Sequence, residues 1–171
     1  MTALKTPTSG QAARIRMLVL DVDGVLTDGQ IHYDADGREA KVFNVRDGYG
    51  IKQAAAMGIT VAVISGRKSR PVEVRMAELG IEHFRLGQND KLTALHEITG
   101  QLEIPLTEVA CVGDDLPDLP IMEAAALGIA VADAHPAIVE ISDWCTRLGG
   151  GRGAVREVCD LLVSARKGGP A

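Results

Sequence analysis

The chain has few aromatic residues and little positive charge. Five of its 171 residues are aromatic, and its formal charge at pH 7 is −5. Few aromatic rings argue against a protein that stacks on nucleic acid bases, and the negative charge argues against an electrostatic grip on phosphates or on an anionic membrane. No apolar stretch approaches the length of a membrane span. We therefore expect neither a nucleic acid nor a membrane as partner.

The sequence also lacks paired cysteines and recognisable targeting signals. Three cysteines occur without a Cys-x-x-Cys pair, which predicts free thiols and a cytoplasmic protein. Residues 1–14 have no apolar signal-peptide segment and are expected to form a loose N-terminal tail. We expect one domain over residues 15–166 and a short C-terminal tail over residues 167–171, because no repeat or change in composition divides the chain.

Five short apolar runs are typical of buried strands in a parallel sheet. They cover residues 17–20, 59–64, 81–86, 109–112 and 129–132. Four segments between them have helical character and are each followed by glycine, a common residue just after a helix. These segments cover residues 50–57, 71–79, 91–99 and 120–127, and a last helix is expected over residues 154–165. The alternation predicts a doubly wound, Rossmann-like α/β sheet.

Residues 29–45 interrupt this alternation. Two extended arms flank the Asp-Ala-Asp-Gly sequence of residues 34–37, and Asp-Gly between alternating arms is a strong β-hairpin signal. We expect a β-hairpin inserted after the first strand. The remaining connections are too short to hold a cap domain, so the protein should have none.

Polar side chains follow the strands at the points where the strands end. They are Asp21, Asp23, Ser65, Asp114 and Asp115. Because ligands bind at the carboxyl ends of strands in an open α/β sheet, we expect these side chains to face one crevice. Lys91, at the start of the following helix, should lie on the same rim.

The acidic residues in this set predict a metal ion. Two like charges a few ångströms apart repel by ~4 kcal/mol at an effective dielectric constant of 20, so a cation must be present. Carboxylates without nearby cysteine or histidine suit Mg²⁺, which also binds substrate phosphates. Lys91 and the Ser65 hydroxyl are then candidates for contacts with phosphate oxygens.

Asp21 and Asp23 have the spacing that lets two carboxylates act on one phosphate group. Residues two apart on an extended strand point the same way, so one carboxylate can attack while the other handles the leaving-group proton. Asp21 can also be a metal ligand only. Asp118 either caps the helix at Pro120 or orients Lys91.

The order of these motifs resembles the haloacid dehalogenase superfamily of aspartate-nucleophile phosphatases. The matching sequences are Asp21-Val-Asp23-Gly24-Val-Leu-Thr27, Ser65-Gly66-Arg67, Lys91 and Gly113-Asp114-Asp115-x-x-Asp118. The resemblance runs from about residue 17 to residue 162. Longer strings at residues 44–50 and 150–157 resemble members that hydrolyse phosphorylated keto sugar acids. The implied substrate is an eight-carbon sugar acid phosphate, with a nine-carbon relative as the alternative.

The resemblance implies a role for each matching position. Asp21 is the expected nucleophile and Mg²⁺ ligand, Asp23 the general acid and base and a ligand through its carbonyl, and Asp114 the third ligand. Ser65 and Lys91 are expected to hold the phosphoryl group, with Asp115 and Asp118 beside the ligands. The expected substrate contacts are Asn44, Val45, Arg46, Asp47, Gly48, Lys52, Arg67 and Arg75. Lys52 stands where relatives often have arginine, and its single ammonium group binds a carboxylate less specifically than the paired N–H groups of arginine.

The resemblance also implies a homotetramer in which hairpins assemble and a neighbour closes the uncapped site. We expect the glycine-rich tract at residues 149–153 to carry Arg152 to an active site as a mobile cation. The alternative to an enzyme is a receiver-type signalling module, which also places acids, a hydroxyl and a lysine at strand ends. Such a module has an adjacent acidic pair after strand one, whereas here the pair follows strand four, so the layout favours the enzyme.

Overall fold

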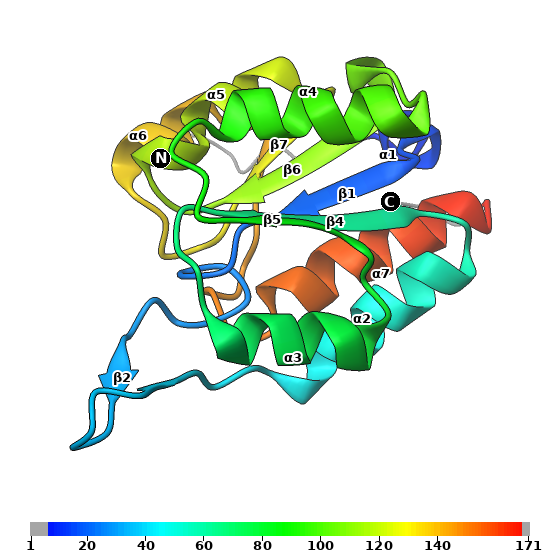
Figure 1. The fold of residues 1–171 in the computed structure, drawn as a ribbon. Helices are drawn as coiled ribbons and strands as arrows, with labels where there is room; N and C mark the ends of the chain where they lie inside the picture. The colour runs from blue at the N-terminus through cyan, green and yellow to red at the C-terminus, as the bar shows by residue number, and fades with distance from the viewer. Residues whose placement is uncertain (1–6, 169–171) are drawn as a thin grey trace.

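A single parallel sheet forms the centre of the molecule, and the computed structural model describes residues 7–168 (Figure 1). The six strands are arranged in the order β5-β4-β1-β6-β7-β8. Their bounds are β1 Met17–Leu20, β4 Thr60–Ser65, β5 His83–Leu86, β6 Val109–Gly113, β7 Leu127–Ala130 and β8 Trp144–Cys145. All neighbouring strands are parallel. The predicted doubly wound α/β fold is confirmed, and residues 7–168 contain no cap domain.

Helices cover both faces of the sheet. Their bounds are α1 Ser9–Arg14, α2 Val45–Ala56, α3 Arg70–Leu79, α4 Lys91–Leu102, α5 Leu119–Ala124, α6 Pro136–Ile141 and α7 Ala154–Arg166, with short 3-10 helices η1 Leu106–Glu108 and η2 Leu116–Asp118. Helices α2, α3 and α7 lie on one face, and α4, α5 and α6 lie on the other (Figure 1).

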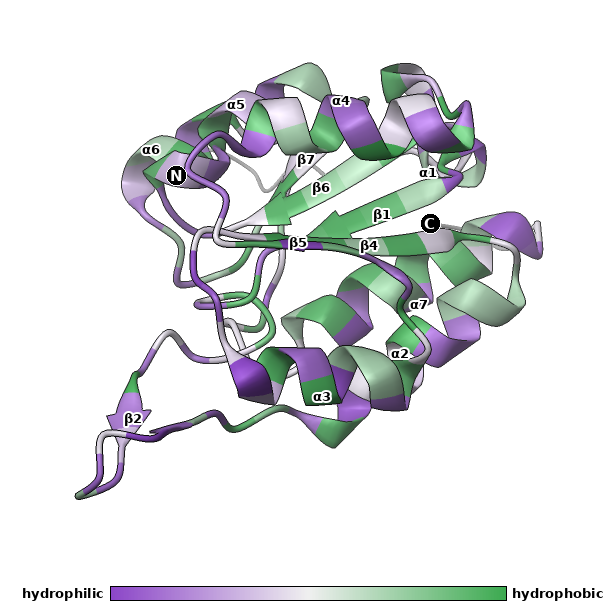
Figure 2. Cartoon of the chain, viewed as in Figure 1, coloured by the Kyte–Doolittle hydropathy of each residue, from purple (hydrophilic) through white to green (hydrophobic). Residues whose placement is uncertain are grey.

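Strands β1, β4, β6 and β7 are mostly apolar on both sides, as expected for a sheet covered by helices, whereas the edge strand β5 contains His83 and Arg85 (Figure 2). Leu18 and Leu20 of β1 pack toward α2, α3 and α7, whereas Met17 and Val19 pack toward α4 and α5. The alternating side chains of one strand therefore contribute to two separate cores. None of the helices described over residues 7–168 has the length and apolar content needed to cross a membrane.

The hairpin projects away from this body. Strands β2 (His32–Tyr33) and β3 (Glu39–Ala40) pair antiparallel and form a two-stranded sheet of their own (Figure 1). Gly37 has a φ of +76° in the turn, a conformation that glycine adopts without strain. The predicted hairpin is confirmed, although its second arm ends earlier than expected because Asn44 caps α2 and Val45 already belongs to that helix.

Several expected boundaries are wrong. Helix α4 runs through Gly100 and ends where Glu103 takes a left-handed conformation, so Gly100 is not its terminator. Helix α5 ends at Ala124, and residues 127–130 form β7, two residues before the expected start. The apolar content of residues 120–132 is continuous, and hydrophobicity alone does not separate helix from strand there. His135 before Pro136 indicates the start of α6, whereas no pattern in the sequence indicates the two-residue strand β8.

The expected loose tail over residues 1–14 is also partly wrong. Residues 9–14 form α1, whose first turn is closed by a reciprocal capping box between Thr8 and Gln11. Ala12 is fully buried in the same core as the inner face of α7. Residues 1–6 and 169–171 lie outside the described residues; Lys167 and Gly168 follow α7 as a turn.

Candidate active site

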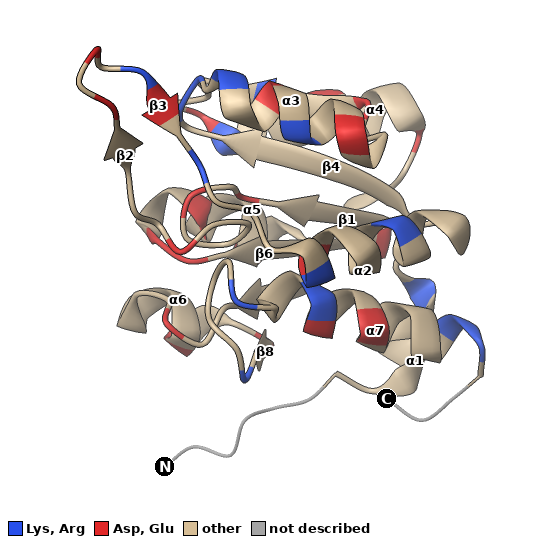
Figure 3. Ribbon diagram, turned by 90° about the horizontal axis from the view of Figure 1, so that it is seen from below, with Lys and Arg blue, Asp and Glu red and all other residues tan. Residues whose placement is uncertain are grey.

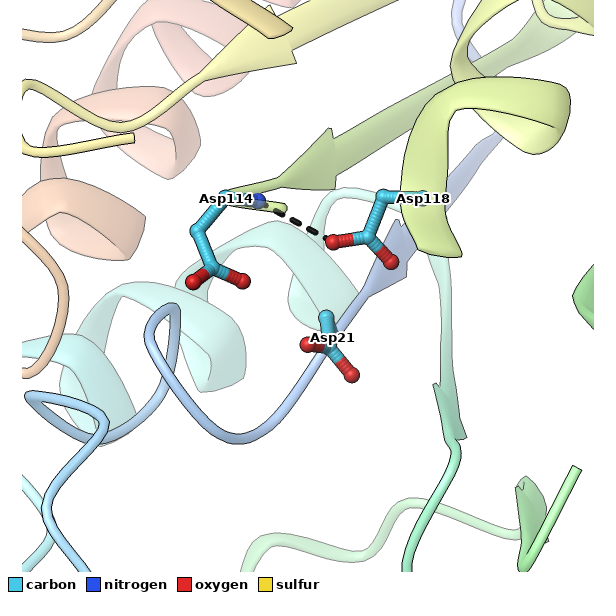
Figure 4. A group of neighbouring side chains, drawn as sticks. All are labelled: Asp21, Asp114 and Asp118. Carbon is cyan, nitrogen blue, oxygen red and sulfur yellow. Dashed lines mark hydrogen bonds between the residues drawn. The ribbon is translucent and has the colours of Figure 1, made fainter. Parts of the chain in front are cut away.

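The carboxyl end of the sheet gathers charged side chains that we call the strand-end cluster: Asp21, Lys91, Asp114 and Asp118. Asp21 follows β1 and Asp114 follows the neighbouring strand β6, so the cluster lies where the order of the sheet changes direction. One carboxylate oxygen from each of the three aspartates lies within 4.8 Å of the others (Figure 4). The structure thus brings Asp21, Asp114 and Lys91 together at one edge, as the strand ends predict.

Lys91 is held between two carboxylates. Its Nζ lies 2.8 Å from Asp21 Oδ1 and 2.6 Å from Asp118 Oδ1, and its side chain is 4% exposed. Burial disfavours the charge of Lys91, but the two carboxylates outweigh it, so the pKa of Lys91 is raised. The lysine therefore stays charged in the position where a phosphoryl group would approach Asp21.

Asp118 uses both of its oxygens within the protein. Oδ1 accepts from Lys91, while Oδ2 accepts from the backbone N–H of Asp114 at 3.0 Å and of Asp115 at 3.4 Å (Figure 4). It makes no side-chain cap on α5. Of the two expected roles, the contacts fit the orientation of Lys91 and not a cap at Pro120.

Asp21 and Asp114 remain available to a ligand. Burial, followed by the charge of Asp118, raises the pKa of Asp21 to about 6. Burial, followed by the charges of Asp21 and Asp118, raises the pKa of Asp114 to about 8. The Asp114 carboxylate makes no hydrogen bond or ion pair with any residue in the described range. These carboxylates are destabilised as anions unless a cation joins them.

The donor set fits Mg²⁺. The oxygens of Asp21 and Asp114 face one another, and neither cysteine nor histidine accompanies them in this group. A hard cation with oxygen ligands is the chemistry that such a pair supports. Gly24 makes room for the arrangement, since a Cβ at that position would lie 2.0 Å from Asp114 Oδ2.

Ser65 and Asp115 lie at the ends of their expected strands. Ser65 is the last residue of β4, next to β1, and its buried hydroxyl accepts from the backbone N–H of Arg67 at 3.3 Å. Asp115 is exposed, caps η2 and accepts from the backbone N–H of Leu116 at 2.8 Å. Its charge contributes to the raised pKa of Asp114. Asp115 therefore lies next to Asp114 and makes no hydrogen bond or ion pair with the carboxylates of Asp21 or Asp114.

Asp23 points its carboxylate into a different group, which we call the hairpin network: Asp23, Glu39, Lys41, Arg67 and Ser69. Lys41 Nζ bonds Asp23 Oδ1 and lies 3.3 Å from Glu39 Oε1. Arg67 lies 2.7 Å from Glu39 and 3.7 Å from Asp23 Oδ2. Charges of both signs line the hairpin and the loop that faces it (Figure 3).

The residues expected to contact substrate divide between two surroundings. Asn44 caps α2 and donates through Nδ2 to the Gly151 carbonyl at 3.1 Å, and Val45 is exposed at the first position of that helix. Arg75 reaches the Asn44 carbonyl at 3.5 Å and passes over Gly48, where a Cβ would lie 2.3 Å from its Nη2. These residues form the wall between α2 and α3, beside the hairpin network.

Asp47, Lys52 and Arg46 are placed elsewhere than expected. Asp47 is buried and accepts from the backbone N–H of Arg156 at 2.8 Å, so its carboxylate serves the first turn of α7. Lys52 is exposed on α2 and makes no hydrogen bond or ion pair with any described residue. Arg46 is exposed and lines a surface pocket with Trp144, outside the strand-end cluster. The helical backbone from Val45 onward turns each successive side chain by roughly 100° about the helix axis, so these three side chains leave α2 in different directions.

The glycine-rich tract is packed against the site loop of its own chain. A Cβ at Gly150 would lie 1.8 Å from the Gly24 carbonyl oxygen, and the backbone N–H of Gly151 donates to the Val25 carbonyl at 2.9 Å. The Arg152 side chain is exposed and lies 3.5 Å from Asp28. The tract therefore lies against the loop that follows β1 and continues directly into α7, as the expected last helix requires, and the contact of Arg152 with an active site stays a prediction.

Three members of the hairpin network, Glu39, Lys41 and Ser69, are not among the site residues that the sequence predicts. A signal was present for two of them, because Glu39 and Lys41 are two residues apart on an extended arm and so face the same side. Nothing in the sequence indicated that this side meets Asp23.

Comparison with known proteins identifies the family. Residues 87–149 match the family model of haloacid dehalogenase-like hydrolases. The chain is 54% identical over 156 residues to the 3-deoxy-D-manno-octulosonate 8-phosphate phosphatase of Escherichia coli K12, covering 91% of this chain and 83% of that protein. This similarity excludes the receiver-type alternative.

Solved structures agree. The phosphatase of the same name from Moraxella catarrhalis, in complex with a magnesium ion, a phosphate ion and 3-deoxy-D-manno-octulosonate (KDO), is 45% identical with a TM-score of 0.91, covering 93% of this chain and 91% of that one. The cobalt-bound enzyme from Haemophilus influenzae is 43% identical with a TM-score of 0.89, covering 92% of each. The chain belongs to the 3-deoxy-D-manno-octulosonate 8-phosphate phosphatase family of haloacid dehalogenase-like hydrolases.

Proposed function

We infer that the chain is a Mg²⁺-dependent phosphomonoesterase that hydrolyses 3-deoxy-D-manno-octulosonate 8-phosphate to the free sugar acid and phosphate. The strand-end cluster carries this conclusion, because it places a carboxylate with a free oxygen beside a buried, charged lysine at the edge where ligands bind. Relatives that share half of the sequence bear the name of this phosphatase. One structural relative was solved with magnesium, phosphate and the sugar acid.

Asp21 is the proposed nucleophile. Its carboxylate oxygen attacks phosphorus, the bond from phosphorus to the sugar oxygen breaks, and Asp23 gives a proton to the departing oxygen. Asp23 then takes a proton from water as the water oxygen bonds phosphorus, and the bond between phosphorus and Asp21 breaks. Phosphate leaves, and both aspartates return to their starting state.

Asp21, Asp114 and the carbonyl of Asp23 are the proposed Mg²⁺ ligands. When bound, the ion supplies positive charge that offsets the charge of the substrate phosphate and of the two carboxylates. Lys91 and the Ser65 hydroxyl hold the phosphoryl oxygens. Asp118 holds Lys91 in its position, so the lysine does not need to rearrange during the reaction.

The sugar acid is proposed to lie along the wall between α2 and α3 formed by Asn44, Val45, Gly48 and Arg75, next to Arg67 of the hairpin network. Arg67 and Arg75 suit a carboxylate, which they can bind with paired N–H groups. The Asp47 carboxylate instead accepts a hydrogen bond from the backbone of Arg156 in α7. A contact from Arg46 or Lys52 requires a movement of the side chain or a neighbouring subunit.

We also propose that the enzyme is a cytoplasmic homotetramer. Three free, buried cysteines support a reducing compartment. The hairpin supports assembly, because a two-stranded sheet has two open edges and Ile31, Tyr33 and Val42 are exposed on or near it. Arg152 is exposed and is proposed to contact substrate in its own or a neighbour's site.

Phosphate release from a panel of phosphate esters, with and without Mg²⁺, tests the proposed function. The panel contains the eight-carbon sugar acid 8-phosphate, a nine-carbon sugar acid 9-phosphate and simple hexose phosphates. We expect Mg²⁺-dependent release with the highest kcat/KM for the eight-carbon ester. If hexose phosphates are hydrolysed as fast as the eight-carbon ester, the proposed substrate is refuted. If phosphate release is equally fast without Mg²⁺, the proposed dependence on the metal is refuted. Arg152→Met should lower turnover; unchanged turnover would refute the role of Arg152.

A further inference from the structure

Lys41 occupies an unusual position for a residue on an exposed hairpin. The strands β2 and β3 are largely exposed, yet the Lys41 side chain just after β3 is 1% exposed. A buried ammonium group is costly unless it is paired, so its partners determine why it is there. Those partners are Asp23 and Glu39.

We propose that Lys41 is a positioning residue for Asp23, held in place by Glu39. This inference rests on the proposed function, in which Asp23 transfers the proton. The Lys41 ammonium bonds Asp23 Oδ1, whereas Asp23 Oδ2 makes no hydrogen bond with any described residue and has only Arg67 at 3.7 Å. One oxygen is fixed and the other is left for the proton that passes to the sugar oxygen.

Glu39 fastens this arrangement to the body of the molecule. Its carboxylate accepts from the hydroxyl of Ser69, the residue just before α3, and from Arg67 at 2.7 Å. The same carboxylate lies 3.3 Å from Lys41. Asp23 is thus joined to the loop after β4 through two hairpin residues.

The charges in the hairpin network balance. Two carboxylates face one lysine and one arginine, and the Glu39 side chain is itself 12% exposed. The balance explains how the Lys41 ammonium group can be buried on an otherwise exposed hairpin. Lys41 contacts Asp23 in the loop after β1 as well as Glu39 on its own hairpin, so attachment of the hairpin alone does not account for the geometry.

The alternative is that Lys41 only anchors the hairpin. A positioning role and an anchoring role differ in their dependence on the leaving group. A sugar alkoxide needs a proton to leave, whereas p-nitrophenolate is stable without one, so a misplaced acid slows the first substrate more than the second. The parameter to compare is kcat/KM, since it includes the step in which the leaving group departs.

The experiment compares Lys41→Met and Lys41→Arg with the natural chain on the sugar acid phosphate and on p-nitrophenyl phosphate. We expect Lys41→Met to lower kcat/KM by about 100-fold on the sugar phosphate and by less than about 5-fold on the aryl phosphate. Lys41→Arg should restore part of the loss. Lys68→Met is the matched control, because it removes a lysine charge from the exposed loop that faces the hairpin, and it should show no such difference.

Asp23→Ala provides the reference pattern. It should show the same dependence on the leaving group, and adding Lys41→Met to it should cause little further loss, because both changes disable one function. If Lys41→Met lowers kcat/KM equally on both substrates, or lowers it on neither, the proposed role of Lys41 is overturned and the proposed phosphatase function still stands. Absence of the pattern in Asp23→Ala would instead refute the proposed role of Asp23.

A second variant covers the case in which Lys41→Met does not fold. Glu39→Gln/Lys41→Gln removes one charge of each sign, so no single buried charge is left unpaired. We expect the same selective loss on the sugar phosphate. A folded double variant with the natural ratio of kcat/KM values for the two substrates would overturn the proposal.

Discussion

The strand-end cluster and the hairpin network come within two residues of each other at Asp21 and Asp23 but are built in different ways. Asp21 follows a fully buried strand that is paired on both sides, so the sheet itself sets its position. Asp23, two residues later, is oriented by a lysine from a hairpin that has no partner in the main sheet. The nucleophile depends on the core, and the proton-transferring residue depends on an appended element.

This difference separates two kinds of requirement in the reaction. Attack on phosphorus needs the same geometry for every phosphate ester, and a rigid sheet supplies it. Protonation of the leaving group depends on what the substrate is, and the hairpin network lies beside the wall that is proposed to bind the sugar acid. Changes in the first region should affect all substrates, and changes in the second should affect some more than others.

The largest effect is expected from Asp21→Asn. The amide cannot attack phosphorus, so kcat should fall by roughly 10⁴-fold or more on sugar and aryl phosphates alike. Steady-state phosphate release measures the loss. Asp36→Asn in the exposed hairpin turn is the control and should retain full activity. Substantial activity of Asp21→Asn would refute the mechanism.

Lys91→Met should have the next largest effect and should also destabilise the protein. It leaves the carboxylates of Asp21 and Asp118 without their shared cation, which costs about 3–5 kcal/mol in the free energy of unfolding. The kcat should fall by about 10³-fold on both classes of substrate. Denaturant titration and kinetics measure the two effects. The variant Asp118→Asn/Lys91→Met should recover part of the stability but none of the activity, and recovery of both would contradict the role of Lys91.

Gly150→Ala tests the loop that joins the two regions. Its new Cβ would lie 1.8 Å from the Gly24 carbonyl oxygen, so the loop that carries Asp23 must shift. A displacement of this kind should lower kcat/KM by about 10- to 100-fold. Gly100→Ala is the control, since its Cβ meets nothing within 4 Å on α4, and it should stabilise the helix by about 0.5–1 kcal/mol. Full activity of Gly150→Ala would show that the position of Asp23 does not depend on the close contact between Gly150 and Gly24.

The smallest effect is expected in the dependence of stability on pH. The pKa values of Asp21 and Asp114 are raised from 3.8 to about 6 and about 8, so the folded chain holds these protons more tightly than the unfolded chain. Without Mg²⁺, the stability that these protons confer is present below about pH 4 and is lost as the pH rises through 6 and 8.

Mg²⁺ should reverse this loss. The increase in Tm on adding Mg²⁺ should therefore grow between about pH 5 and about pH 8.5, reaching about 5 °C. Thermal unfolding with Mg²⁺ or with chelator measures it. The control Asp114→Asn lacks one of the ligands and should show little growth. An increase in Tm that is independent of pH would contradict the shared cation site.

The sequence was most informative where local pattern and strand geometry agree. Apolar runs ending in Asp21 and Asp114 predicted both the sheet and the convergence of the strand-end cluster, because parallel strands end at one edge. Asn44 is a favourable helix cap, but the alternating residues before it favour an extended arm through Val45, so the sequence does not predict the sides of α2 to which Asp47 and Lys52 point. The partnership of Lys41 with Asp23 depends on how the hairpin folds back, which no local pattern encodes.

The most direct test of the central claim is to identify the residue that receives the phosphoryl group. The natural enzyme is mixed with the sugar acid phosphate and Mg²⁺, quenched in acid within milliseconds, digested and examined by mass spectrometry. The account predicts one phosphoryl group on Asp21 that forms before free phosphate accumulates. A phosphoryl group on another residue, or the steady release of phosphate with no labelled peptide under conditions that preserve acyl phosphates, would contradict it.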